Sequence, residues 1–203
     1  MLPRLAAGLL ALAGLIPATV SAQVVELRIQ GSIGPATSNY VTSGLAQAAT
    51  DNAPMVLVTI DTPGGLDTAM REIVQAILAS PVPVAGYVTP GGARAASAGT
   101  YILYASHIAV MAPATNLGAA TPVQMGGGGP LPGGEPTPES SGDDETAQKE
   151  ATAADSDTAK RRKVVNDAVA YLRGLAEQRG RNADWAEQAV RAGVSLTASA
   201  ALE

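Results

Sequence analysis

The stretch MVLVTIDTPGG, residues 55–65, decides the fold class of this chain. Residues 55–61 form a continuous apolar run, which is typical of a strand buried on both faces of a parallel sheet. The sequence TPGG at residues 62–65 then ends the strand, because proline and glycine interrupt regular structure. We expect chemistry at this point, since ligands of open α/β sheets bind at the carboxyl ends of the strands.

The segments around this strand alternate between strand and helix patterns. Further strands are predicted at 24–29, 82–88 and 108–111, and helices at 36–52, 66–78 and 93–105. This order predicts an α/β fold, in which right-handed crossovers connect the strands of a mostly parallel sheet. A second glycine pair, Gly91-Gly92, falls at the end of another predicted strand.

The pattern changes at residues 121–160, which contain four consecutive glycines, several prolines and an acidic stretch. Such a composition cannot bury enough apolar surface to order itself, so we predict a flexible loop. Beyond it, an apolar stripe from Val164 to Ala176 predicts a helix that ends at Gly180. Asn182 is the expected N-cap of a further helix over 183–190.

The composition limits the classes of function. The chain has 203 residues, of which 46% are hydrophobic, and a formal net charge of −5, so it can form a core but lacks the basic balance expected of a nucleic-acid-binding protein. It contains no cysteine, which excludes disulfides, thiolate metal sites and a cysteine nucleophile. We expect no metal and no cofactor.

Residues 1–22 have the pattern of a signal peptide. Arg4 supplies a positive charge, residues 5–16 are apolar, and Val20-Ser21-Ala22 resembles a cleavage site. An uncleaved N-terminal anchor is the alternative. We expect residues 23–203 to form one domain outside the cytoplasm, either periplasmic or on the extracytoplasmic face of the membrane.

Ser97, in the run GGARAASAGTYI at residues 91–102, is the candidate nucleophile. Its neighbours are nearly all alanine or glycine, which lets a substrate strand approach closely. The start of a helix favours developing negative charge, and the N–H groups of Gly64, Gly65 and Ala98 are candidate oxyanion donors. The alternatives are a serine that only packs between helices and glycines that only form a turn.

A serine nucleophile needs a base. His107 is the single histidine, but it lies ten positions after Ser97, about 15 Å along one helix, so we expect a structural or surface histidine at a helix-to-strand junction. The other candidates are Lys149, Lys160 and Lys163, each of which could act as a base if burial lowered its pKa. The helical pattern does not choose among them, because Lys163 falls off the apolar stripe and Lys160 lies near its edge.

Taken together, these motifs resemble the N-terminal domain of NfeD-type membrane-bound serine proteases, which belong to the ClpP class. The matching stretches are 25–35, 60–65, 93–104, 112–122 and 163–187. The resemblance implies a ClpP/crotonase-like fold, with repeated ββα-type layers around a mostly parallel sheet. The membrane helices and the small C-terminal β-domain of full-length relatives are missing, so we expect the domain to be truncated within its last helix.

The resemblance also implies a Ser–Lys dyad, in which Ser97 is the nucleophile, Lys163 is the general base, and Gly64 and Ala98 are oxyanion donors. ClpP itself uses a histidine, whose position would fall near Ala120 and Thr121, and the lack of a histidine there favours a dyad. A homodimer, a preference for apolar peptide segments and a stomatin-like membrane partner are implied as well.

We therefore expect a serine endopeptidase that cleaves apolar peptide segments through an acyl-enzyme. The main alternative is a non-catalytic scaffold on the same fold that binds a peptide or a membrane partner. Acyl-CoA chemistry is a further alternative, since crotonases share the fold, but it expects a cytoplasmic protein and the signal peptide argues against it.

Overall fold

The computed structural model describes residues 23–123 and 144–202, with the side chains of the second range described from residue 158 onward. The predicted signal peptide, residues 1–22, lies outside the described residues, and so does the part of the predicted loop at 124–143. From residue 25 to residue 88, strands and helices alternate in the order expected of an α/β fold.

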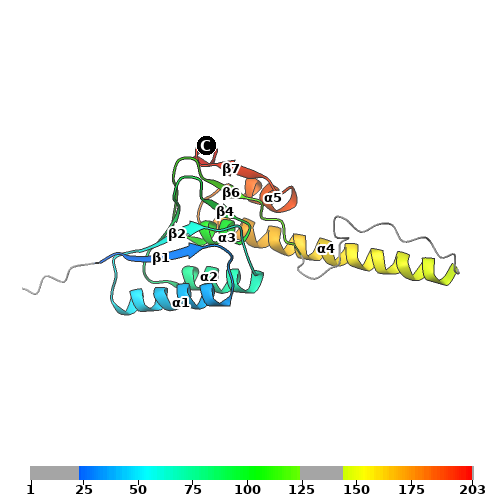
Figure 1. The fold of residues 1–203 in the computed structure, drawn as a ribbon, viewed down its shortest axis with the longest axis horizontal. Helices are drawn as coiled ribbons and strands as arrows, with labels where there is room; N and C mark the ends of the chain where they lie inside the picture. Colours follow the sequence, from blue (N-terminus) through cyan, green and yellow to red (C-terminus); the bar gives the residue numbers. More distant parts are fainter. Residues whose placement is uncertain (1–22, 124–143, 203) are drawn as a thin grey trace, which may run out of the picture.

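A four-stranded parallel sheet forms the centre of the molecule (Figure 1). Its strands, in spatial order, are β1 (Val25–Gln30), β2 (Val56–Asp61), β3 (Val84–Val88) and β5 (Ile108–Met111). The apolar run at 55–61 thus becomes an inner strand, paired on both edges, and its alternate residues Val56, Val58 and Ile60 are fully buried. The prediction of a mostly parallel sheet is confirmed.

Two helices, α1 (Pro35–Thr50) and α2 (Asp67–Ala79), lie side by side on one face of this sheet (Figure 1). The buried side of α2 has the i, i+3, i+4, i+7 spacing of one helix face, with Met70, Ile73, Val74 and Ile77. Because α2 begins two residues after Gly65, its packing also fixes the position of the glycine pair at the end of β2.

A second sheet of three short strands contains the segment before Ser97. In this sheet β4 (Arg94–Ala96) pairs in parallel with β6 (Asn116–Gly118), and β6 pairs in antiparallel with β7 (Ser195–Thr197). The strand β6 was not predicted, and for residues 195–197 the sequence indicates the start of an element but not its type, because three residues are too few to show a period.

The helix predicted over 93–105 is wrong in its first part. Arg94–Ala96 form the strand β4, and only Ala98–Ala105 form the helix α3. The strand is held by Thr62, whose N–H donates to the Arg94 carbonyl at 2.7 Å and whose carbonyl accepts from the Ala96 N–H at 3.1 Å. This long-range pairing outweighs the helical propensity of an alanine-rich run.

The remaining described elements are α4 (Asp144–Gln178), α5 (Ala183–Arg191) and the 3₁₀ turn η1 (Ala200–Leu202). The loop predicted to end at residue 160 is wrong from Asp144 onward, because residues 144–160 lack glycine and proline and are rich in alanine and other helix formers. In Figure 1 the N-terminal half of α4 extends away from both sheets. The predicted cap of α5 is confirmed, since Asn182 Oδ1 accepts from the Trp185 N–H at 2.8 Å.

The C-terminal half of α4 packs into the core. The predicted apolar stripe is buried at Ala168, Leu172, Leu175 and Ala176, but Val164 at its start is 39% exposed. Tyr104 of α3 stacks on Trp185 of α5, with ring centroids 5.8 Å apart. Among the helices that the structure describes, none is long and apolar enough to cross a membrane.

Candidate functional site

Ser97 lies between the end of β4 and the start of α3, and it is half-buried. Its φ is +53°, a left-handed backbone conformation that non-glycine residues rarely adopt. The Ser97 N–H donates to the Gly118 carbonyl in β6 at 2.8 Å, which holds the turn in this conformation. Strain of this kind persists where the surrounding structure enforces it, and it is frequent at active sites.

Gly64 lies directly against Ser97. A Cβ atom built on Gly64 would be 2.7 Å from Ser97 Cβ and 3.1 Å from Ser97 Oγ, and the φ of Gly64 is +118°. The Gly64 N–H donates to Thr62 Oγ1 at 3.0 Å, so this N–H already has a partner in the free chain. It would have to exchange that partner to bind an oxyanion.

The other two candidate donors lie on different sides of this turn. Gly65 packs against the backbone of Ile33, where an added Cβ would be 2.0 Å from the carbonyl oxygen. Ala98 is the first residue of α3, and N–H groups in the first turn of a helix have no acceptor within the helix. The structure therefore brings Gly64 and Ala98 to Ser97, while Gly65 contacts the loop before α1.

Thr100 was missed by the sequence analysis, although it helps to position Ser97. Its buried hydroxyl accepts from the Gly118 N–H at 3.0 Å and is 2.8 Å from the Ala95 carbonyl, so it joins β4 to β6 around the serine. A threonine inside a run of small residues carries no pattern that would have indicated this role.

Lys163 and Lys160 are both exposed on α4, and neither is hydrogen-bonded to Ser97 within the described part of the chain. The side chain of Lys149 lies outside the described residues. Within the described residues there is therefore no hydrogen bond between Ser97 and a lysine, and Lys163 is exposed.

The direction of α4 nevertheless brings Lys163 toward the Ser97 end of α3. Tyr101 stacks on Tyr171 with ring centroids 5.9 Å apart, and the Ala105 carbonyl accepts from Arg179 Nε at 2.9 Å. The two helices thus run in the same direction. Lys163 lies eight residues before Tyr171, about 12 Å back along α4, on the side where α3 begins.

Arg71 of α2 fixes this stretch of α4. Its guanidinium pairs with Asp67 at 2.9 Å and with Asp167, and it lies 4.4 Å from the ring centroid of Tyr171. Asp67 is the first residue of α2 after the glycine pair, and Asp167 is one helical turn after Lys163. Arg71 therefore links the candidate oxyanion turn to the candidate base helix, which spacing alone could not indicate.

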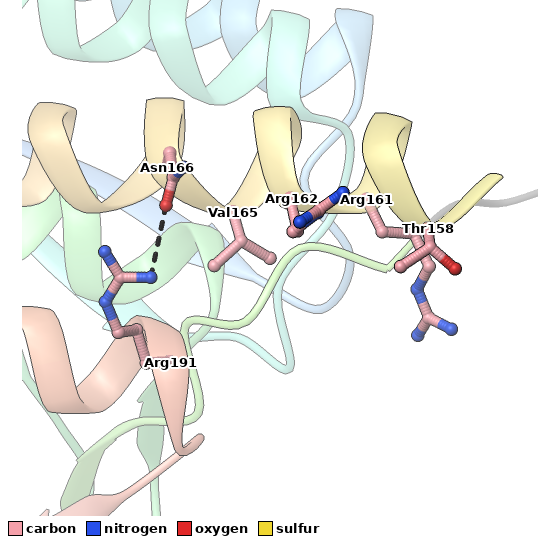
Figure 2. A pocket seen from close by; sticks show the side chains of 6 residues that line it. All are labelled: Thr158, Arg161, Arg162, Val165, Asn166 and Arg191. Carbon is pink, nitrogen blue, oxygen red and sulfur yellow. Dashed lines mark hydrogen bonds between the residues drawn. The ribbon is translucent and has the colours of Figure 1, made fainter. Parts of the chain in front are cut away.

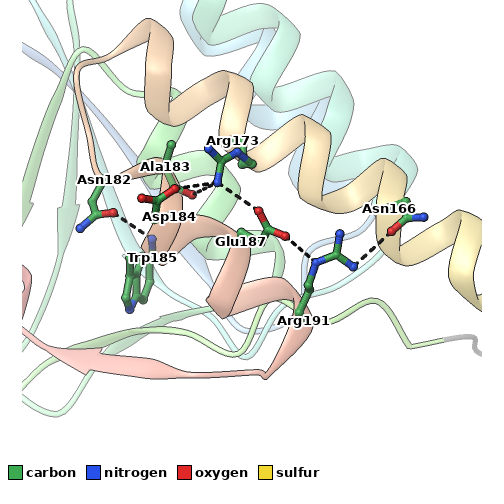
Figure 3. Close-up of polar contacts among 8 residues, drawn as sticks. All are labelled: Asn166, Arg173, Asn182, Ala183, Asp184, Trp185, Glu187 and Arg191. Carbon is green, nitrogen blue, oxygen red and sulfur yellow. Dashed lines mark hydrogen bonds and ion pairs between the residues drawn. The ribbon is translucent and has the colours of Figure 1, made fainter.

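A polar network joins α4 to α5 (Figure 3). Arg173 binds Asp184 at 2.9 Å and Glu187 at 3.0 Å, and Glu187 also binds Arg191 at 2.6 Å. The hydrogen bond from Arg191 lowers the pKa of Glu187, with a further contribution from Arg173. Arg191 in turn donates to Asn166 Oδ1 at 3.2 Å, so its guanidinium is held against α4.

His107 lies at the predicted helix-to-strand junction, between α3 and β5, and it is exposed. Its Nδ1 accepts a hydrogen bond from the Val84 N–H at 3.2 Å. Burial lowers the pKa of His107, and so do the nearby charges of Arg179 and Arg181. The neutral form is therefore favoured. Among the described residues, no group of three His, Asp or Glu side chains is placed to hold a metal ion.

Comparison with protein families gives a match over residues 23–130 to a family model described as "NfeD1b, N-terminal domain". The membrane-bound protease PH1510 of Pyrococcus horikoshii is 35% identical over 181 residues, which are 89% of this chain and 35% of that protein. The chain thus spans about a third of the length of this relative.

Two solved structures are also similar, and both are described as the 1510-N membrane-bound stomatin-specific protease. A serine-to-alanine mutant has a TM-score of 0.70 and 34% identity, covering 90% of this chain and 77% of that one. A lysine-to-alanine mutant in complex with a substrate peptide has a TM-score of 0.69 and 34% identity, covering 90% of this chain and 73% of that one. These likenesses confirm the α/β fold class over most of the chain.

Proposed function

Because this chain belongs to the family described as NfeD1b, N-terminal domain, we propose that it is a serine endopeptidase with a Ser97–Lys163 dyad. The observation that carries the proposal is the close contact between Gly64 and Ser97, which places the glycine turn at the end of β2 directly beside the candidate nucleophile. The relatives named as a stomatin-specific protease, solved as a serine mutant and as a lysine mutant, support the reaction class.

The proposed reaction is hydrolysis of a peptide bond through an acyl-enzyme. Lys163, in its neutral form, accepts the Ser97 hydroxyl proton while Oγ attacks the scissile carbonyl. The N–H groups of Gly64 and Ala98 stabilise the oxyanion. Lys163 then gives its proton to the leaving amine, and a water molecule hydrolyses the Ser97 ester.

Two features of the free chain must change for this reaction. Lys163 is exposed, so a substrate or a second copy must cover it before it can act as the base beside Ser97. The Gly64 N–H must turn from Thr62 Oγ1 to the oxyanion. Both changes fit an enzyme whose site is completed on binding, and we propose a homodimer as the active form.

We further propose that the substrate is an apolar peptide segment of a stomatin-like membrane protein. The basis is the description of the relatives as stomatin-specific. The signal-peptide pattern at residues 1–22 supports a location on the extracytoplasmic side of the membrane.

A non-catalytic peptide-binding scaffold is the second candidate. Two observations favour it: Lys163 is exposed, and the Gly64 N–H is already hydrogen-bonded to Thr62 Oγ1. Such a protein would bind peptide equally well with or without Lys163 and would cleave in neither form.

Labelling with a fluorophosphonate, read by mass spectrometry, tests the proposal. We expect the label on Ser97 in the wild type and a large loss of labelling in Ser97→Ala and in Lys163→Ala. Lys160→Ala is the matched control, since it removes an exposed lysine three residues away and should be labelled normally. Absence of label on the wild-type protein, together with unchanged peptide binding by Lys163→Ala, would favour the scaffold.

A further inference from the structure

A pocket of about 320 Å³ lies between α4 and the end of α5, and neither Ser97 nor Lys163 lines it (Figure 2). Its lining residues are Thr158, Arg161, Arg162, Val165, Asn166 and Arg191. Five of these lie on one face of α4, at the i, i+3, i+4, i+7, i+8 spacing of a single helical stripe. Its volume is at the small end of ligand pockets, which fits one or two side chains.

Three guanidinium groups give this pocket its charge. Arg161 and Arg162 are exposed, and no carboxylate among the described residues pairs with either of them. Arg191 is partly neutralised by Glu187, and it is fixed in place by Asn166. A net positive charge remains on a small concave surface, although the whole chain is acidic.

The chain around Ser97 leads directly to this pocket. The Ser97 N–H donates to Gly118, and three residues later Thr121 Oγ1 donates to the Val190 carbonyl, next to Arg191. Three residues span at most about 10 Å. Figures 2 and 3 both draw this segment passing between α4 and α5. A peptide that lies along the segment from Ser97 would reach the pocket after a few residues.

We propose that this arginine pocket binds a carboxylate of the peptide substrate, several residues away from the scissile bond. The assignment rests on the proposed peptidase function. Arginine donates two parallel N–H bonds to a carboxylate, so three arginines around a small cavity suit an acidic side chain or a peptide C-terminus. An apolar peptide with one acidic residue is thus the substrate class that the pocket selects.

The test measures binding in a Ser97→Ala background, so that no cleavage occurs. The probes are a short apolar peptide with one glutamate and an amidated C-terminus, its glutamine isostere, and the glutamine peptide with a free C-terminus. We expect the glutamate peptide to bind about tenfold more tightly than the amidated glutamine peptide. The free-acid peptide tells whether a chain terminus or a side chain supplies the carboxylate.

Adding Arg161→Gln and Arg162→Gln should remove this preference. Both residues are exposed, so the fold should tolerate the change. Arg28→Gln is the matched control, since Arg28 is an exposed arginine on β1 that pairs with Glu26, and it should keep the preference. The charge-reversed pair Arg161→Glu and Arg162→Glu should instead prefer a lysine peptide.

Equal affinities for all three peptides would overturn the proposal, whether or not Ser97 is a nucleophile. A preference that survives in the double glutamine variant would overturn it as well. If the double variant lost only binding to phosphatidylglycerol vesicles, the arginines would serve a membrane surface and the peptide assignment would be wrong. Failure of fluorophosphonate labelling would refute the peptidase function but would leave the binding comparison valid.

Discussion

A side chain at Gly64 would occupy the space beside the Ser97 hydroxyl, because a Cβ atom at Gly64 would be 2.7 Å from Ser97 Cβ and 3.1 Å from Ser97 Oγ. The close approach of the two residues thus depends on the absence of a side chain in a different strand-to-helix turn. An oxyanion formed at Ser97 would need both this space and the adjacent N–H groups.

Gly64→Ala should therefore reduce fluorophosphonate labelling of Ser97 by about a hundredfold, because the added Cβ would displace Ser97 from the Gly64 N–H, with an effect similar to the loss of one oxyanion donor. Gly92→Ala is the matched control, since Gly92 has a φ of +90° but open space around its Cα. Both variants should lose about 1 kcal/mol or more of stability from backbone strain, but only Gly64→Ala should lose labelling. Equal labelling of the two variants would contradict the assignment of Gly64.

Arg71→Gln should slow the labelling of Ser97 by roughly ten- to a hundredfold, because it releases the turn of α4 that follows Lys163. We also expect the pH profile of labelling to shift, since the environment of the base would change. Arg173→Gln is the control, because it removes ion pairs between α4 and α5 at the far end of the same helix. Arg173→Gln should reduce the melting temperature but keep the wild-type pH profile.

Thr100→Val should destabilise the protein by about 1–3 kcal/mol, because it leaves the Gly118 N–H buried without its acceptor. It should also reduce labelling, since Gly118 holds Ser97. Thr115→Val removes another buried hydroxyl, which donates to the Ala112 carbonyl at 2.6 Å, and it should cost stability alone. Urea unfolding and labelling rates of both variants check this difference.

Stability should decrease as the pH falls below about 6.5, the usual pKa of histidine. The pKa of His107 is lowered in the folded state by burial and by Arg179 and Arg181, so the unfolded chain binds the proton more strongly. This contribution to stability is complete above the unfolded pKa and is lost as the pH falls through the folded pKa. His107→Asn should flatten that part of the pH dependence of the urea midpoint, relative to wild type.

The sequence predicted the elements that are long and regularly patterned. The strands of the parallel sheet were found because residues 24–29 alternate between apolar and polar and residues 55–61 and 82–88 are apolar runs, and α5 was found because Asn182 marks its start. The prediction of one helix over the alanine-rich run at 93–105 was partly wrong, because the strand at its start forms only through pairing with Thr62 and β6. The start of α4 was predicted as part of a loop, because the helix-forming residues from Asp144 onward directly follow a segment rich in glycine and proline.

The candidate site was predictable only in part, for a related reason. Ser97 and Gly64 stand out locally, as a serine among small residues and as a glycine pair after a strand. Thr100 and Arg71 act through partners distant in sequence, and no local pattern encodes those contacts. The partner of Ser97 stays a prediction, because the chain places Lys163 on an exposed helix face.

The left-handed backbone of Ser97 has a consequence for the history of such a protein. A non-glycine residue in that conformation reduces the stability of the fold by about 1–3 kcal/mol. Under the proposed function, this loss is offset only while the Ser97 hydroxyl serves as the nucleophile. A lineage that no longer needed the reaction would gain stability by drifting to glycine at this position. Under the proposed function, glycine at the position of Ser97 in a relative would therefore indicate that the reaction has been lost, because the gain in stability alone would favour glycine there.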